Sequence, residues 1–141
     1  MRVSYQVGRL DRLLRRRLGR ALEPHGLSLA EYTTLSVLRE RSGLSNAQLA
    51  RRSLITPQSM NEVLARLEQR KLVRRRPAPQ HGRVRPAELT GAGERLLATA
   101  DRSVDAVEQD LLAGISAVDR RALAALLEHA ERGLSARYQA T

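Results

Sequence analysis

Three helix-start signals follow one another over residues 28–57. Ser28-x-x-Glu31 and Ser45-x-x-Gln48 are capping boxes, in which the serine hydroxyl accepts a bond from a backbone N–H and the Glu or Gln side chain returns one. Thr56-Pro57 joins a favoured N-cap to the residue favoured at the first helical position. The chain must therefore start three helices in close succession, and the middle one, over about residues 46–52, has room only to be short.

The spacing of apolar residues predicts how far the helices extend and where strands lie. Apolar residues at steps of three and four predict helices over about residues 3–22, 57–70, 90–113 and from 116 onward. Residues 72–76 and 83–89 predict two strands that return through a turn containing Pro and Gly. The predicted fold class is therefore mainly α with a small β-hairpin wing, which is a winged helix-turn-helix.

The charge of the chain is unevenly distributed. Residues 1–85 hold 19 Arg or Lys against 6 Asp or Glu, a net of +13, whereas residues 86–141 hold 6 against 9, a net of −3. Such an asymmetry indicates a part that binds a polyanion joined to a neutral or acidic part. Because the chain has only three aromatic residues, all tyrosine, single-strand binding by base stacking is disfavoured.

The fourth predicted helix has an apolar face and a polar face. The polar face carries Gln58 and Asn61, residue types that pair bidentately with adenine in the major groove. We therefore expect Gln58 and Asn61 to read bases, and Thr56, Ser59 and Arg66 to contact phosphates or bases. By itself, such a polar face is also typical of an ordinary solvated helix.

The predicted hairpin is strongly basic. Its stretch RRRPAPQHGRVR holds five arginines and no acidic residue, so we expect it to be self-repelling unless an anion binds it. In a wing, such side chains contact phosphate or enter the minor groove. The expected wing contacts are Arg74, Arg76, His81, Arg83 and Arg85, with Arg83 as the minor-groove candidate.

Residues 27–93 resemble the multiple antibiotic resistance regulator (MarR) family of transcription regulators. The matching stretches are LSLAEYTTLSVL, then LSNAQLARRSLITPQSMNEVLARLEQRKLVRR, then HGRVRPAELTGAG. The junction Leu89-Thr90 followed by Gly93 is typical of that family. The pieces occur in the family's order and spacing, and the flanking helices match its layout.

The resemblance implies a homodimer on double-stranded DNA. The whole chain, 1–141, would form one MarR-like domain with a DNA-binding lobe at 28–90 and dimerisation helices at 1–24 and 91–141. In the fifth helix an apolar seam able to pair with another helix runs through Leu97, Ala100, Val104, Val107 and Leu111. Two recognition helices roughly 34–36 Å apart would meet a pseudo-palindromic operator.

The resemblance also implies that the protein is a repressor and that a small aromatic effector releases it from DNA. Tyr5, His25 and Tyr32 are candidates for its pocket, although each of these residues is more often a plain packing residue. The family wing usually has an Asp where this chain has His81. His81 would leave Arg83 less fixed, or contact phosphate itself and make affinity sensitive to pH.

Several other classes are disfavoured. The chain has no cysteine, so it has no disulfide and no thiol sensor, and its three histidines are too scattered for a metal site. No signal peptide and no membrane-spanning apolar run is evident, so we expect a cytoplasmic protein without a cofactor. No catalytic motif is present in the sequence, and we expect Asp101 and Asp105 to be an ordinary solvated pair. We therefore expect that the protein is not an enzyme.

Two alternatives to the ligand-responsive regulator stay open. One is a constitutive or architectural DNA-binding protein with no effector, which aromatic acids would not stabilise. The other is a protein-interaction module that uses the winged fold without nucleic acid, which strongly salt-dependent DNA binding would reject.

Overall fold

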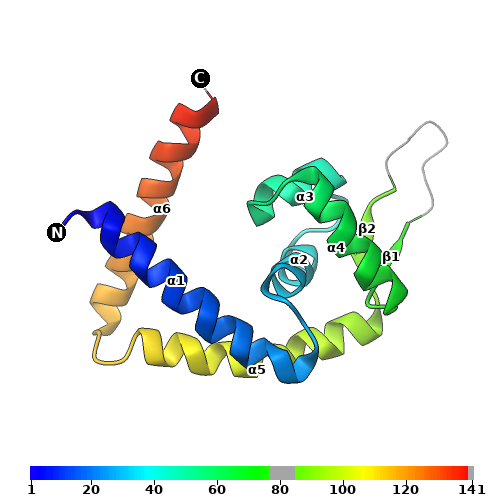
Figure 1. Cartoon of the computed structure of the whole chain (residues 1–141), viewed down its shortest axis with the longest axis horizontal. Coiled ribbons are helices and arrows are strands. Elements are labelled where there is room, and N and C mark those ends of the chain that lie inside the picture. The colour runs from blue at the N-terminus through cyan, green and yellow to red at the C-terminus, as the bar shows by residue number, and fades with distance from the viewer. Residues whose placement is uncertain (77–84, 140–141) are drawn as a thin grey trace. The chain divides into compact units, whose positions relative to one another are not determined.

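A computed structural model describes residues 1–76 and 85–139 of the chain (Figure 1). Its elements in chain order are α1 (Val3–Leu22), the 3-10 turn η1 (Glu23–His25), α2 (Leu29–Glu40), α3 (Asn46–Ser53), α4 (Pro57–Gln69), β1 (Val73–Arg75), β2 (Ala87–Leu89), α5 (Gly91–Leu111) and α6 (Ala117–Gln139). The predicted fold class, mainly α with a small hairpin, is confirmed. The chain divides into two compact units, Met1–Val107 and Glu108–Thr141.

All three predicted helix starts are confirmed. Ser28 and Ser45 each accept a bond from the N–H three residues on, and Glu31 and Gln48 each accept one from the serine N–H, so both capping boxes are complete. The Thr56 hydroxyl accepts a bond from the Ser59 N–H at 3.1 Å. These local bonds fix where α2, α3 and α4 begin.

The turn between α3 and α4 is made by a leucine in a left-handed conformation. Leu54 has φ 55° and ends α3, and the Ile55 N–H then donates to the Ala50 carbonyl at 3.1 Å. The side chain of Leu54 is 82% exposed, so no packing holds it there. A left-handed conformation costs a residue with a Cβ about 1–2 kcal/mol. This tight reversal lets α4 follow α3 closely.

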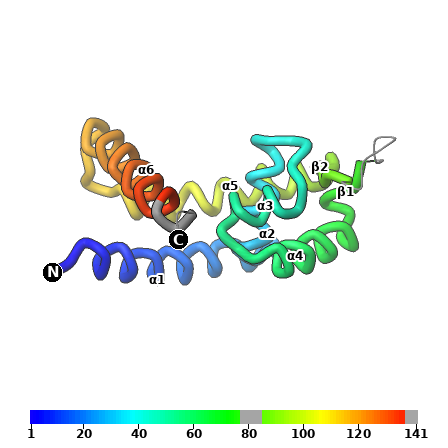
Figure 2. The backbone as a smooth tube through the Cα atoms, turned by 90° about the horizontal axis from the view of Figure 1, so that it is seen from above, coloured from blue at the N-terminus to red at the C-terminus, as the bar shows by residue number. Residues whose placement is uncertain are grey.

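The core of the first unit joins these helices into one lobe. Figures 1 and 2 both show α2, α3 and α4 gathered together with the hairpin beyond α4. The predicted apolar stripe of α4 is confirmed, since all its members are buried: Met60, Val63, Leu64 and Leu67. Leu97 and Ala100, which lie on the predicted apolar seam of α5, are buried in this core.

The two strands are antiparallel and pair Val73 with Leu89, Arg74 with Glu88 and Arg75 with Ala87. They are shorter than predicted: β1 ends at Arg75 and β2 begins only at Ala87. Pro86 precedes β2 and has no N–H, but its carbonyl accepts the Arg76 N–H at 2.9 Å. The predicted turn at residues 77–82 lies outside the described residues.

The start of α5 approaches the start of β1 closely. The Thr90 hydroxyl donates to the Lys71 carbonyl at 2.6 Å and accepts the Gly93 N–H at 3.1 Å. A Cβ on Gly93 would lie 2.1 Å from the carbonyl oxygen of Leu72, far inside contact distance. Only glycine fits at residue 93, which explains the Leu89-Thr90…Gly93 junction in physical terms.

The second unit consists of the end of α5 and α6. Ser116 caps α6, since its hydroxyl accepts the Asp119 N–H at 3.2 Å. The apolar side chains of α6 are exposed: Val118, Leu123, Leu126, Leu127 and Leu134. Across the described part of the chain, no helix is both long and apolar enough to cross a bilayer.

Candidate nucleic-acid interface

The outward face of α4 carries the predicted contact residues. Met60, Val63 and Leu64, which lie between them in the sequence, are buried. The predicted contact residues are all exposed: Thr56, Gln58, Ser59, Asn61 and Arg66. At the N-terminus of the helix, the Thr56 and Ser59 hydroxyls are 2.9 Å apart and hydrogen-bonded. The geometry thus presents hydroxyl, amide and guanidinium groups along one solvent-facing side of a helix.

A relay of three side chains joins α3, α4 and β1. Arg75 Nη1 donates to Asn46 Oδ1 at 2.8 Å, and Asn46 Nδ2 donates to Asn61 Oδ1 at 2.6 Å. The same Nη1 also donates to the Arg85 carbonyl at 3.0 Å. Asn46 was not among the predicted residues, because nothing in the spacing of the sequence indicates that it lies beside Asn61. The relay fixes the base of the hairpin against α4.

Two arginines of the hairpin, Arg74 and Arg76, share an acidic partner. Glu88 bonds both Arg74 Nε, at 2.7 Å, and Arg76 Nε, at 2.5 Å. The antiparallel register brings Glu88, an acidic residue outside the predicted basic stretch, opposite Arg74, so part of that stretch is paired within the chain. The hydrogen bonds from Arg76 and Arg74 lower the pKa of Glu88.

Glu88 nevertheless leaves the hairpin cationic. One carboxylate faces two guanidinium groups, and the side chains of Arg74 and Arg76 are 67% and 50% exposed. Glu88 engages their Nε atoms, so the Nη amino groups can still meet a phosphate. Arg85 is exposed as well, while His81 and Arg83 lie outside the described residues.

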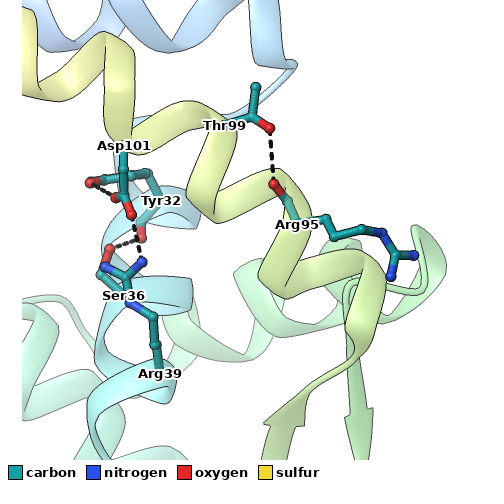
Figure 3. Close-up of polar contacts among 6 residues, drawn as sticks. All are labelled: Tyr32, Ser36, Arg39, Arg95, Thr99 and Asp101. Atoms are coloured by element: carbon teal, nitrogen blue, oxygen red, sulfur yellow. Dashed lines mark hydrogen bonds and ion pairs between the residues drawn. The ribbon is translucent and has the colours of Figure 1, made fainter.

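A second polar cluster links α2 to α5 (Figure 3). The Tyr32 hydroxyl donates to Asp101 Oδ1 at 2.6 Å, and Arg39 Nη1 donates to Asp101 Oδ2 at 2.5 Å. Burial, together with the bond to Asp101, raises the pKa of Tyr32 to about 12. Burial opposes ionisation of Asp101, but the bonds from Arg39 and Tyr32 outweigh it and lower its pKa.

Asp101 is therefore not the solvated residue that we expected beside Asp105. The expectation fails because its partners, Tyr32 and Arg39, lie more than sixty residues earlier in the chain. His25 reaches the same helix, with its Nε2 2.8 Å from the Ser103 hydroxyl. Of the ligand-pocket candidates, Tyr32 and His25 thus contact α5 at positions two residues apart. Tyr5 lies on α1 and is 55% exposed.

Among the described residues no group of three or more His, Asp or Glu could hold a metal ion.

The geometry defines the class of protein. The chain has a tight helix-turn-helix whose second helix has an exposed polar face, and a cationic hairpin lies beside it. This arrangement is a winged helix-turn-helix. A family model described as MarR family matches residues 25–84. The HTH-type transcriptional repressor Rv2887 of Mycobacterium tuberculosis is 38% identical over 126 residues, which are 89% of this chain and 91% of that protein. The chain belongs to the MarR family.

Solved structures show the same fold. Rv2887 in complex with DNA has a TM-score of 0.75 at 36% identity, and the match covers 92% of this chain and 97% of that one. Rv2887 in complex with salicylic acid has a TM-score of 0.75 at 37% identity, covering 92% and 96%. The transcriptional repressor CouR, bound to a 23-mer DNA duplex, has a TM-score of 0.83 at 24% identity and covers 92% of each chain, a likeness of fold alone.

Proposed function

We propose that this protein is a homodimeric transcription regulator, a repressor, that binds a pseudo-palindromic sequence in double-stranded DNA. The observation that carries the proposal is the exposed polar face of α4 beside the cationic hairpin. A helix of this kind fits the major groove, where side chains at its N-terminal end reach the base edges. The likeness to Rv2887, a repressor solved with DNA, supports the same function.

Each predicted contact has a place in this proposal. Gln58 and Asn61 read bases from α4, and Thr56, Ser59 and Arg66 contact phosphates or neighbouring bases. Arg74, Arg76 and Arg85 hold phosphates from the hairpin, and His81 and Arg83 complete the wing. Residues 28–90 are then the DNA-binding lobe.

Residues 1–24 and 91–141 are proposed as the dimerisation helices of the single domain. Both regions expose apolar side chains to water in a single chain. On α1 these are Val3, Val7, Leu10 and Leu13, and on α6 they are Leu123, Leu126, Leu127 and Leu134. Exposed apolar surface on this scale is typical of a protein–protein interface. We propose that a second copy of the chain covers it.

A small aromatic acid is the proposed effector. Rv2887 has been solved with salicylic acid and with p-aminosalicylic acid. Tyr5, His25 and Tyr32 remain the candidate pocket residues, of which His25 and Tyr32 are supported by their shared contact with α5. The protein would act in the cytoplasm, as a regulator and not as an enzyme. The alternative, a constitutive or architectural DNA-binding protein, predicts no stabilisation by any aromatic acid in a thermal-shift series.

The proposal is tested by selecting bound duplexes from a random DNA pool and titrating the enriched one at several salt concentrations. We expect an imperfect palindrome, and affinity that falls linearly on logarithmic axes with a slope near −0.9 per phosphate contact. Salt-dependent binding without an enriched sequence would favour the architectural alternative. No binding at low salt would overturn the proposal.

A further inference from the structure

We propose that Asn46 determines which base Asn61 can read, by turning the Asn61 amide so that it presents hydrogen-bond donors to the DNA. The inference rests on the proposed function, because it concerns the base contacts of α4. Asn46 lies at the first position of α3 and is half-buried, so it is a positioning residue. Its effect on DNA runs through Asn61, which is exposed.

The direction of the relay follows from the chemistry of its first member. A guanidinium has five N–H donors and no acceptor, so the group that faces Arg75 must be an oxygen. Asn46 therefore turns Oδ1 to Arg75 Nη1, at 2.8 Å, which leaves its Nδ2 for the other side. That Nδ2 faces Asn61 at 2.6 Å and requires an acceptor, so Asn61 must turn its own Oδ1 inward.

Arg75 is itself well anchored at the start of this relay. Its side chain is only 22% exposed, its Nη1 also donates to the Arg85 carbonyl, and its Nε lies 3.8 Å from Glu68 Oε1. The base of the hairpin thus sets the polarity of an amide on α4. No described residue accepts a bond from Asn61 Nδ2, which leaves two N–H groups for a ligand.

This polarity changes the base preference that the residue type alone suggests. Bidentate pairing with adenine needs one donor for N7 and one acceptor for the N6 amino group. Asn61 Oδ1 is turned toward Asn46 on α3, whereas Nδ2, on the other side of the amide, can donate to both N7 and O6 of guanine, two acceptors on one edge. The structure therefore favours guanine over adenine at the base pair that Asn61 contacts.

The test compares base preference among variants of the full-length protein. Asn61→Ala first identifies the base pair, as the one whose preference disappears. At that pair we expect the unaltered protein to prefer guanine to adenine about tenfold, within the range for a good bidentate contact. Affinities are measured with duplexes that differ at that pair alone.

Two substitutions of Asn46 then probe the polarity. Asn46→Ala frees the Asn61 amide, so the guanine preference should fall to within about twofold. Asn46→Asp keeps the size of the side chain but offers only acceptors, so it should draw Asn61 Nδ2 inward and turn Oδ1 outward. The preference should then shift toward the bases with an amino donor, adenine and cytosine.

Gln48→Ala is the matched control. It removes the second half of the capping box at the start of α3 but lies outside the relay, so it should leave base preference unchanged. Circular dichroism checks folding, and the near-isosteric Asn46→Asp variant suffices if Asn46→Ala does not fold. If the unaltered protein prefers adenine, or if the Asn46 variants keep the base preference of the unaltered protein, the inference about Asn46 is wrong and the proposed function still stands. If the unaltered protein enriches no sequence from the random DNA pool, the proposed function is wrong, and so is the role of Asn61 in reading a base.

Discussion

The hydroxyl of Tyr32 lies 2.6 Å from the carboxylate of Asp101, so α2 and α5 are joined by a charge-assisted hydrogen bond (Figure 3). α2 packs in the lobe that holds α4, whereas α5 belongs to the part that we propose for dimerisation. Arg39, also on α2, holds the other oxygen of the same carboxylate. A substitution in this cluster would therefore affect the packing of both the DNA-binding lobe and α5.

Replacing Tyr32 by Phe removes one bond of this cluster without changing the packing of the ring. We expect the free energy of unfolding to fall by about 1–2 kcal/mol, since the lost bond is to a charged acceptor that is 26% exposed. In a double-mutant cycle measured by chemical denaturation, Tyr32→Phe and Asp101→Asn should be non-additive. Tyr5→Phe, on an exposed tyrosine, should have no effect. Additive changes would mean that the bond contributes nothing.

The lowered pKa of Asp101 predicts the pH dependence of this stabilisation. A carboxyl group whose pKa is lower in the folded state stabilises the fold above its unfolded pKa, about 3.9, and loses this effect as pH falls through the folded value. The difference in unfolding free energy between the unaltered protein and Asp101→Asn should be constant from pH 7 to about 5 and shrink below about 4. A difference that grows on acidification contradicts the assignment.

Gly93→Ala should destabilise the protein markedly. The added Cβ would lie 2.1 Å from the Leu72 carbonyl oxygen, so α5 or β1 must move, at a cost of about 1–3 kcal/mol. Gly19→Ala is the control, because a Cβ there meets nothing within 4 Å and alanine favours a helix. Thermal unfolding at equal protein concentration compares the two, and equal melting temperatures would show that the close approach is absent.

Leu54→Gly should stabilise the turn between α3 and α4. Leu54 adopts φ 55° with its side chain 82% exposed, so glycine relieves backbone strain and removes little packing. After the greater chain entropy of unfolded glycine is subtracted, a gain of about 0.5–1 kcal/mol remains. Leu54→Ala keeps the Cβ and should show no such gain. Urea denaturation distinguishes the variants, and a loss of stability in Leu54→Gly would reveal a contact made by the leucine.

Glu88→Gln should strengthen binding to DNA of any sequence. The carboxylate partly neutralises Arg74 and Arg76, and its removal adds one positive charge to the hairpin. Fluorescence anisotropy with random duplexes should show tighter binding and a salt slope steeper by about one phosphate contact. Glu94→Gln, at the start of α5, is a charge-matched control. Weaker binding by Glu88→Gln alone would mean that Glu88 positions the arginines more than it neutralises them.

Local chemistry made much of this fold predictable. The capping boxes at Ser28 and Ser45 and the Thr56-Pro57 pair act over three residues, so their effect can be read from the sequence directly. The apolar stripe of α4 is predictable in the same way, because its members lie three or four residues apart in the sequence. The strands Val73–Arg75 and Ala87–Leu89 are shorter than the sequence predicts, because composition does not limit how far two strands pair.

Polar partnerships across the fold were not predictable. Glu88 faces Arg74 only because of the strand register, and Asp101 meets Tyr32 only when α5 packs on α2. Asn46 reaches Asn61 because Leu54 turns the chain back on itself. Each of these contacts depends on tertiary structure, so the residue types were visible in the sequence while their pairing was not.

The most direct test of the central claim is the stoichiometry of the protein on the duplex that it selects. Sedimentation of the purified protein with that duplex should show two chains per DNA, and a duplex cut to one half-site should bind far more weakly. A single chain per duplex with full affinity for one half-site would contradict the account.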